Sequence, residues 1–344
     1  MSDSPQAAIP APRKPRAPRP EPPVPSVLPA RLASVHDALL GWYARVGRDL
    51  PWRRTRDPYQ ILVSEIMLQQ TQVDRVIPKF HQFLAAFPTL ASLAAAPLAE
   101  VIRVWAGLGY NRRAVRLHAI ARQAVKQLGG ALPTTPEGLQ SLDGLGAYTS
   151  NAVACFSAEA QVGVVDTNVR RVLGRVFADE IGLEPTAGPP LQRFAEAVLP
   201  PGQAYAWNQA LMDLGATVCT ARNPNHTVCP LALQCTGRAQ LEAADAVTAP
   251  RRAAERGPEY QVRTTVPFEQ TTRYFRGRIV AACRELPPGE TVGLDELGVL
   301  LRADYTAEFR PWVAELVRGL ARDGLIAVHE VQDDPDSETR VSLP

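Results

Sequence analysis

The sequence predicts a mainly α-helical protein that ends in a small α+β module. Three observations support this fold class. From Ala30 to about Leu241, apolar residues recur every three or four positions, as they do along one face of an α-helix. Few runs of alternating β-branched residues interrupt that pattern. Near the C-terminus, two apolar runs flank the polar stretch QDDPDSET, which is typical of a β-hairpin.

The composition is that of a soluble globular protein. The chain has 344 residues, enough for two or three domains, and it is 46% hydrophobic and 21% charged. No stretch is long and apolar enough to cross a bilayer, and the N-terminus lacks an apolar signal region. We therefore expect a cytoplasmic protein with no membrane partner and with reduced cysteines. The net charge of +2 is too small to predict nucleic-acid binding, so any basic surface must be local.

The N-terminal segment, residues 1–29, is rich in proline and arginine and has little apolar surface to bury. We expect it to be disordered or polyproline-like, either as a solvated leader or as a weak electrostatic tether to DNA. A helical domain is predicted to follow over residues 30–218, and typical helix and loop lengths give roughly ten helices up to about residue 241. Breaks between these helices are expected at Pro51, Pro58, Pro78, Pro88, Pro97, Pro133, Pro136 and Pro200.

The last third of the chain divides into a linker and a separate module. Residues 242–258 (EAADAVTAPRRAAERGP) are mostly small or charged, which predicts a linker before the module at 259–344. Three helices and a hairpin are typical of a winged-helix module, and a docking domain without a nucleic-acid role is the alternative. The expected helices are Arg273–Arg284, Leu294–Leu301 and Thr306–Asp323, and the expected strands are Leu325–Val331 and Arg340–Leu343.

A helix–hairpin–helix is predicted at about residues 136–157. The run LQSLDGLGAYTSNAVACFS places Gly144 and Gly146 between two helical segments, with the second helix starting near Tyr148. Glycine lets such a turn adopt conformations that are costly for other residues, and the start of the second helix offers unpaired N–H groups to a phosphate. A plain αα-turn is the alternative. The helices on both sides, with Leu142 and Leu145 at core positions, favour contact with a DNA backbone.

A carboxylate on an apolar helix face marks the segment DPYQILVSEIMLQQTQVDRV. As a helix, this segment places Glu65 one turn from Ile61 and Leu68. Burial there would raise the pKa of Glu65 and keep it protonated near neutral pH, as a general acid requires. The alternative is a glutamate at the edge of the face that reaches water. Gln69 and Gln70 follow one turn later and are able to read base edges or to fill the gap left by an extruded base.

A second carboxylate precedes the predicted helix of VVDTNVRRVLG. Asp166 stands where an N-cap residue is expected, and capping would fix one carboxylate oxygen while leaving the other free for chemistry. Arg170 and Arg171 supply charge that suits a phosphate, with a solvated charged face as the alternative.

A metal site is predicted in the loop at residues 219–241. The chain has only 5 cysteines, and three of them lie beside a histidine in the order Cys219, His226, Cys229 and Cys235. Thiolate and imidazole ligands suit zinc or an iron–sulfur cluster. Unrelated cysteines beside a surface histidine are the less favoured alternative.

In chain order, these segments resemble the adenine DNA glycosylases of the MutY family, within the helix–hairpin–helix superfamily that carries an iron–sulfur loop. The resemblance covers about Leu39 to Cys235 and implies a glycosylase fold of two helical subdomains. The matching segments are Leu50–Arg53, Ser64–Val73, Trp105–Asn111, Leu142–Val153, Val165–Gly174 and Trp207–Ala221.

The resemblance implies a role for each matched residue. Glu65 would protonate the adenine leaving group, Asp166 would stabilise the oxocarbenium ion, and Asn168 would support it. Trp52, Arg53 and Gln209 would line the adenine pocket, whereas Gln69, Thr71, Leu108 and Tyr110 would wedge into the duplex or touch the opposite base.

The resemblance also implies the partner and the cofactor. The partner would be double-stranded DNA with a mismatched adenine, bound by a monomer at the nucleoid. The cofactor would be a [4Fe–4S] cluster, with zinc as the alternative, and it would hold a basic loop, with Arg222 near its start, against the DNA backbone.

The sequence departs from relatives of the same superfamily at three places. Tyr148 stands where bifunctional glycosylases carry the lysine that forms a Schiff base, so we expect base removal without strand cleavage. His226 replaces the second cysteine of the cluster motif with all spacings kept. No Phe-Ser-His loop of the kind that recognises 8-oxoguanine occurs between Tyr260 and Pro344. The open alternatives are a thymine or uracil mismatch glycosylase and a catalytically inactive DNA-binding module.

Overall fold

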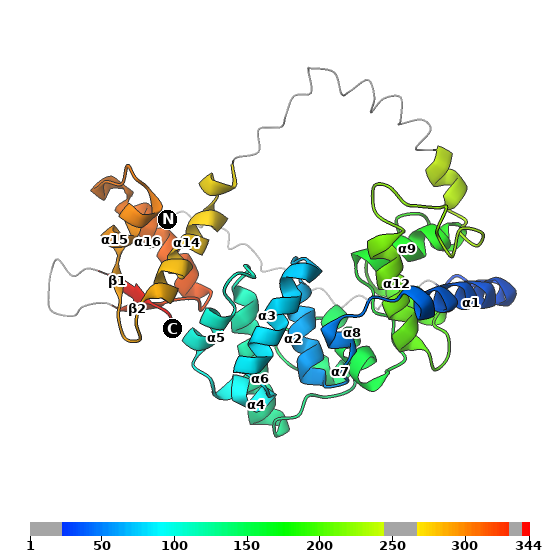
Figure 1. Cartoon of the computed structure of the whole chain (residues 1–344), viewed down its shortest axis with the longest axis horizontal. Coiled ribbons are helices and arrows are strands. Elements are labelled where there is room, and N and C mark those ends of the chain that lie inside the picture. The colour runs from blue at the N-terminus through cyan, green and yellow to red at the C-terminus, as the bar shows by residue number, and fades with distance from the viewer. Residues whose placement is uncertain (1–22, 244–266, 330–338) are drawn as a thin grey trace, which may run out of the picture.

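A computed structural model describes residues 23–243, 267–329 and 339–344. The described chain is mainly helical, as predicted, with a small α+β module at its C-terminal end (Figure 1). The predicted tail up to residue 22, the linker from residue 244 onward and the hairpin turn at 330–338 lie outside the described residues. None of the described helices is long and apolar enough to cross a membrane.

The first helical subdomain is built around α2, whose side chains are buried on almost every face. Asp57 caps this helix by accepting from the Tyr59 N–H, and Pro58 occupies its first position, where the missing N–H costs nothing. Helix α6 ends at Gly129, whose φ of 68° suits a C-terminal glycine. The helices that share this core are α2 (Pro58–Leu68), α3 (Val73–Ala86), α4 (Leu90–Ala95), α5 (Leu98–Val104), α6 (Arg112–Leu128), α7 (Pro136–Gln140) and α8 (Ala147–Ala158).

A second subdomain packs around α12 and lies beside the first (Figure 1). Leu199 and Met212 contact both cores, so the two subdomains form a continuous body. The helices of the second subdomain are α1 (Pro29–Val46), α9 (Thr167–Val176), α10 (Ala178–Ile181), α11 (Pro189–Ala197) and α12 (Ala204–Thr217). The short helix η1 (Pro51–Arg53) connects α1 to α2.

One predicted break is wrong. Pro78 lies inside α3 and does not end a helix. Proline removes one helical hydrogen bond, but α3 buries Val76, Phe80 and Phe83 in the first core. Tertiary burial of this face therefore outweighs the local cost of the proline.

The C-terminal module has its own core and the predicted order of three helices and a hairpin. The structure adds a two-residue strand, β1, which pairs with β3 to give an antiparallel sheet in the order β1-β3-β2. Ile102 of α5 is part of this core, and Arg284 donates to the Ile102 carbonyl and to the Asn111 side chain. The elements are η2 (Phe268–Gln270), α14 (Thr272–Glu285), β1 (Val292–Gly293), α15 (Leu294–Leu301), η3 (Ala307–Phe309), α16 (Arg310–Arg322), β2 (Ala327–His329) and β3 (Arg340–Ser342).

Candidate active site

A pocket of about 330 Å³ lies between the two helical subdomains. The first subdomain contributes Glu65 from α2 and Tyr148 from α8, and the second contributes Asp166 and Gln209. Segments far apart in the sequence therefore meet around one cavity. The predicted site residues that line it are Trp52, Arg53, Glu65, Gln69, Thr71, Tyr148, Asp166, Asn168 and Gln209.

Glu65 is a buried carboxyl group at this pocket. Its residue is 6% exposed, and Oε2 accepts a hydrogen bond of 3.0 Å from the Tyr148 hydroxyl. Burial raises the pKa of Glu65 to about 7, the Tyr148 hydrogen bond opposes that rise, and the Asp166 charge adds to it. The group is therefore protonated in a large share of molecules at neutral pH, as the helical pattern predicted.

Asp166 is the N-cap of α9, as the sequence predicted. Its Oδ1 accepts from the Val169 N–H at 2.7 Å, and its Oδ2 accepts from the Asn168 side-chain amide at 3.1 Å. Both oxygens are thus held in one orientation while the residue still lines the pocket.

Arg171 does not present its charge to a phosphate, contrary to the sequence-based interpretation. Its guanidinium points inward and donates to Asn168 Oδ1 at 2.7 Å, to the Gly215 carbonyl at 2.7 Å and to the Cys219 carbonyl at 2.9 Å. A Cβ atom on Gly215 would lie 2.7 Å from the Asn168 Cβ, so only glycine allows this close approach. Arg170, one position earlier, is exposed.

A buried ion pair beneath the pocket was missed by the sequence analysis. Asp213 of α12 is 1% exposed and accepts two hydrogen bonds of 2.8 Å from Arg53 and one of 2.7 Å from the Arg48 Nε. The Arg53 guanidinium, through its hydrogen bonds and charge, holds the pKa of Asp213 below its usual range despite burial. The sequence signal was the single charged residue of α12, which lies between the apolar Met212 and Leu214.

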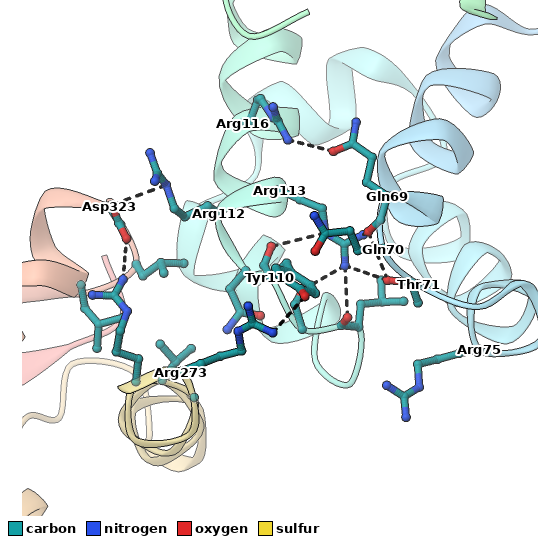
Figure 2. Close-up of a pocket in the computed structure, with 18 of the residues that line it drawn as sticks. Gln69, Gln70, Thr71, Arg75, Tyr110, Arg112, Arg113, Arg116, Arg273 and Asp323 are labelled. Atoms are coloured by element: carbon teal, nitrogen blue, oxygen red, sulfur yellow. Dashed lines mark hydrogen bonds and ion pairs between the residues drawn. The ribbon is translucent and has the colours of Figure 1, made fainter. Parts of the chain in front are cut away.

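Two loops line a larger cleft of about 1220 Å³ next to this pocket, and Figure 2 shows that cleft. We call Gln69–Thr71 and Leu108–Tyr110 the wedge loops. Gln69 and Thr71 line both cavities. Gln70 has a φ of 57° and Tyr110 a φ of 45°, which is the left-handed region that side chains other than glycine rarely adopt. Strain of this kind is common at functional sites.

Arg113 holds the wedge loops together, and the sequence analysis missed it. The residue is 4% exposed, and burial lowers the pKa of its guanidinium to about 10. Its nitrogens donate to oxygen atoms of both loops, as Figure 2 shows, and also to the end of α2. The acceptors are the carbonyls of Ile66, Met67, Gln69, Leu108, Gly109 and Tyr110 and the hydroxyl of Thr71.

The predicted helix–hairpin–helix is formed by α7, a turn and α8. Gly144 has a φ of 91°, and Gly146 is the residue before α8. Leu142 and Leu145 are buried, as predicted. The two glycines do not line the active-site pocket; Gly146 lies one residue and Gly144 three residues before the helix that carries Tyr148.

The predicted metal ligands surround one small cavity beside α9 and α12. Cys219, His226, Cys229 and Cys235 all line it. The His226 Nδ1 lies 3.2 Å from a Glu242 carboxylate oxygen. Across residues 23–243, 267–329 and 339–344, no three such side chains are grouped closely enough to hold a single metal ion. Arg222 is exposed on the same loop.

Comparison with known proteins gives matches to DNA repair enzymes. Residues 63–183 match the family model of the HhH-GPD superfamily base excision DNA repair proteins. The chain is 41% identical over 276 residues to an adenine DNA glycosylase of Mycolicibacterium smegmatis, covering 79% of this chain and 93% of that protein.

Solved structures show the same fold. A thermostable thymine-DNA glycosylase is similar with a TM-score of 0.57 and 28% identity, over 61% of this chain and 98% of that one. A trapped endonuclease III–DNA covalent intermediate is similar with a TM-score of 0.53 and 19% identity, over 63% of this chain and 100% of that one.

Replacement of Arg113 by leucine should destabilise the protein by about 3 kcal/mol, because buried oxygens of both wedge loops would lose their donor. Arg122→Leu is the matched control, since Arg122 is exposed on the same helix. Denaturant unfolding would measure both variants. Equal stability of the two would contradict the assigned role of Arg113.

Replacement of Glu65 by glutamine should stabilise the protein more at pH 8 than at pH 5. The pKa of Glu65 is about 7 in the folded protein against 4.5 ordinarily, so the folded state binds more protons between these values and stability falls as pH rises. The variant should therefore gain about 2 kcal/mol relative to the parent between pH 5 and pH 8. Thermal unfolding at both pH values tests this, and a gain independent of pH would refute the raised pKa.

Proposed function

The chain belongs to the adenine DNA glycosylases, and on that premise we propose that it removes adenine mispaired with 8-oxoguanine or guanine by hydrolysing the N-glycosidic bond. The observation that carries this proposal is the pairing of a protonatable Glu65 with a fixed Asp166 carboxylate on one pocket. Two carboxyl groups whose environments differ are suited to cleavage through a cationic transition state.

Glu65 is the proposed general acid. The adenine must leave the base stack to reach a pocket this far inside the protein. Once there, it would accept a proton from Glu65, which makes the base a better leaving group. Arg53 lines the same pocket, and its buried Nε has no hydrogen-bond partner within the described residues. That donor is available to a nitrogen acceptor of the bound base, while Trp52 and Gln209 enclose it.

Asp166 is the proposed stabiliser of the sugar cation. As the base leaves, positive charge develops on the deoxyribose ring, and a carboxylate held in place lowers the energy of that state. The two hydrogen bonds from Val169 and Asn168 prevent Asp166 from turning away. Water then adds to the sugar cation, its proton passes to the Glu65 carboxylate that protonation of the base left behind, and an abasic site remains.

Tyr148 supports the expectation that no strand cleavage follows. A lyase step needs an amine that forms a Schiff base, and a tyrosine supplies none. Burial raises the pKa of Tyr148 well above its usual value, so the side chain remains a neutral phenol that donates to Glu65. We therefore assign Tyr148 to positioning the general acid.

Several surfaces around the pocket are suited to holding duplex DNA. The wedge loops would fill the gap left by the extruded adenine, with Gln70 and Tyr110 at their strained tips. The hairpin at Gly144 and Gly146 would approach a phosphate with backbone N–H groups. The exposed Arg170 and Arg222 add charge for the backbone. We propose that one copy of the chain suffices and that it acts at the nucleoid, where its substrate is.

We propose that the residues 219–241 hold a four-iron cluster. A single zinc ion needs its ligands in contact with one atom, whereas a cluster binds them to separate irons that stand farther apart. Cys219, His226, Cys229 and Cys235 line one cavity, and three thiolates with an imidazole suit a cluster that is held by several ligands. Glu242 beside the His226 Nδ1 would leave Nε2 for iron, as carboxylates often do for ligating histidines. The cluster would supply structural cross-linking of the loop and no step of base removal.

The base-release reaction should be specific for adenine. Duplexes with A:8-oxoG, A:G, T:G or U:G pairs would be incubated with the protein, and abasic sites would be cut with alkali. We expect cutting of the first two only, and about 10³-fold slower release by Glu65→Gln with unchanged DNA binding. Cutting confined to T:G or U:G would refute the proposal, and breaks without alkali would contradict the role of Tyr148.

The purified protein should contain about four iron atoms and a visible thiolate-to-iron absorption band. Cys235→Ser should lose both signals because one ligand is removed, and His226→Cys should keep them. Cys283→Ser is the control, since Cys283 is buried in the core of the C-terminal module. Stoichiometric zinc without iron in the parent protein would overturn the cluster assignment.

A further inference from the structure

The cleft of about 1220 Å³ beside the wedge loops is strongly basic. The wedge loops and the start of α6 form one wall, and α14 and the end of α16 of the C-terminal module form the other (Figure 2). Among the described residues that line it, Asp323 is the only acidic one. The arginines that line it are Arg75, Arg112, Arg113, Arg116, Arg273 and Arg276.

Most of these arginines already have structural partners. Arg112 and Arg276 both pair with Asp323, Arg113 holds the wedge loops, and Arg116 donates to the Gln69 side chain. Arg75 and Arg273 remain; both are exposed, and Arg273 is the one that the C-terminal module contributes. Its Nη1 donates to the Tyr110 hydroxyl at 3.1 Å, and its guanidinium lies 5.0 Å from the centre of the Tyr110 ring. A guanidinium has five N–H donors, so this exposed side chain keeps most of its donors for a ligand.

The C-terminal module is fixed in a position that holds Arg273 at the cleft. Ile102 of α5 is buried in the module's own core. Arg284 of α14 donates to the Ile102 carbonyl at 3.1 Å, and Arg103 donates to the Leu286 carbonyl at 3.2 Å. Because α14 carries both Arg273 and Arg284, these contacts set the distance between Arg273 and the wedge loops.

The cleft lies on the opposite side of the wedge from the adenine pocket. Gln69 and Thr71 line both cavities, so one begins where the other ends. If an adenine occupies the pocket, the base that was paired with it stays on the far side of the wedge loops, together with the strand that carries that base. An unbalanced row of arginines is suited to the phosphates of such a strand.

We propose that this cleft receives the DNA strand opposite the excised adenine, and that Arg273 contacts a phosphate of that strand. The proposal rests on the adenine-excising function proposed above. It gives the C-terminal module a function as a second DNA-binding element, which holds the strand that keeps its base. Tyr110 orients the Arg273 guanidinium and also belongs to the wedge loops. The wedge loops and the contact between Arg273 and a phosphate therefore act on neighbouring nucleotides.

The first test is binding of a duplex that carries a tetrahydrofuran abasic analogue opposite guanine, which needs no catalysis. Arg273→Ala should bind about tenfold more weakly than the parent, because a charged hydrogen bond is lost. The slope of log K against log salt should become about one unit shallower. Arg318→Ala is the matched control, since it removes the same charge from an exposed position of α16 outside the cleft. Equal affinity of the two variants would overturn the proposal.

The second test identifies the strand. Single phosphates near the site are replaced by neutral methylphosphonates, first in the strand opposite the abasic analogue and then in the strand that carries it. With one of the neutral phosphates in the opposite strand, Arg273→Ala and the parent should bind equally well. With every neutral phosphate in the strand that carries the analogue, Arg273→Ala should still bind more weakly than the parent. The reverse pattern would overturn the assignment. If the parent binds as expected but releases no adenine from A:G, the proposed function fails while the strand contact stands.

Discussion

The active site depends on the buried ion pair between Asp213 of α12 and two arginines that precede α2. Arg48 and Arg53 belong to the segment that enters the first subdomain, whereas α12 is the centre of the second. Glu65 lies on α2, and Asp166 caps α9, which packs against α12. The distance between the acid and the carboxylate is therefore set by the junction that Asp213 holds. Breaking one side of such a pair costs about 3–5 kcal/mol, because a charge is left buried.

The site is also where the protein departs from what would be most stable. Burial keeps Glu65 uncharged at some cost, and the wedge loops hold Gln70 and Tyr110 in a rarely populated backbone conformation. Arg113 offsets part of that cost by donating to both loops at once. The cores of the two subdomains and of the C-terminal module surround these features with closely packed apolar side chains. A rigid frame is what allows strained elements to keep one geometry before DNA arrives.

Local patterns predicted the parts of the site that depend on neighbouring residues. Helical periodicity placed Glu65 on an apolar face, and the N-cap rule placed Asp166 before α9. The sequence did not reveal Arg113 or the inward turn of Arg171, because most of their acceptors lie 42 to 48 residues away in the chain. Pro78 was wrongly predicted to end a helix, because tertiary burial stabilises α3 around it. Strand β1, with two residues, was too short to give a sequence pattern. Long-range pairing of polar groups leaves little trace in local spacing.

The inward turn of Arg171 also explains how the metal loop can matter to the reaction without touching the base. Arg171 donates to the Cys219 carbonyl and to Asn168, and Asn168 donates to Asp166. Cys219, the first proposed ligand of the loop, is therefore three hydrogen bonds from Asp166, the carboxylate proposed to face the sugar. Gly215 permits the close contact that this chain of bonds requires. If this loop binds the proposed cluster, loss of the cluster would release the Cys219 carbonyl first, and the orientation of Asp166 would relax next. The proposed cluster would thus act on the active site through the position of Asp166.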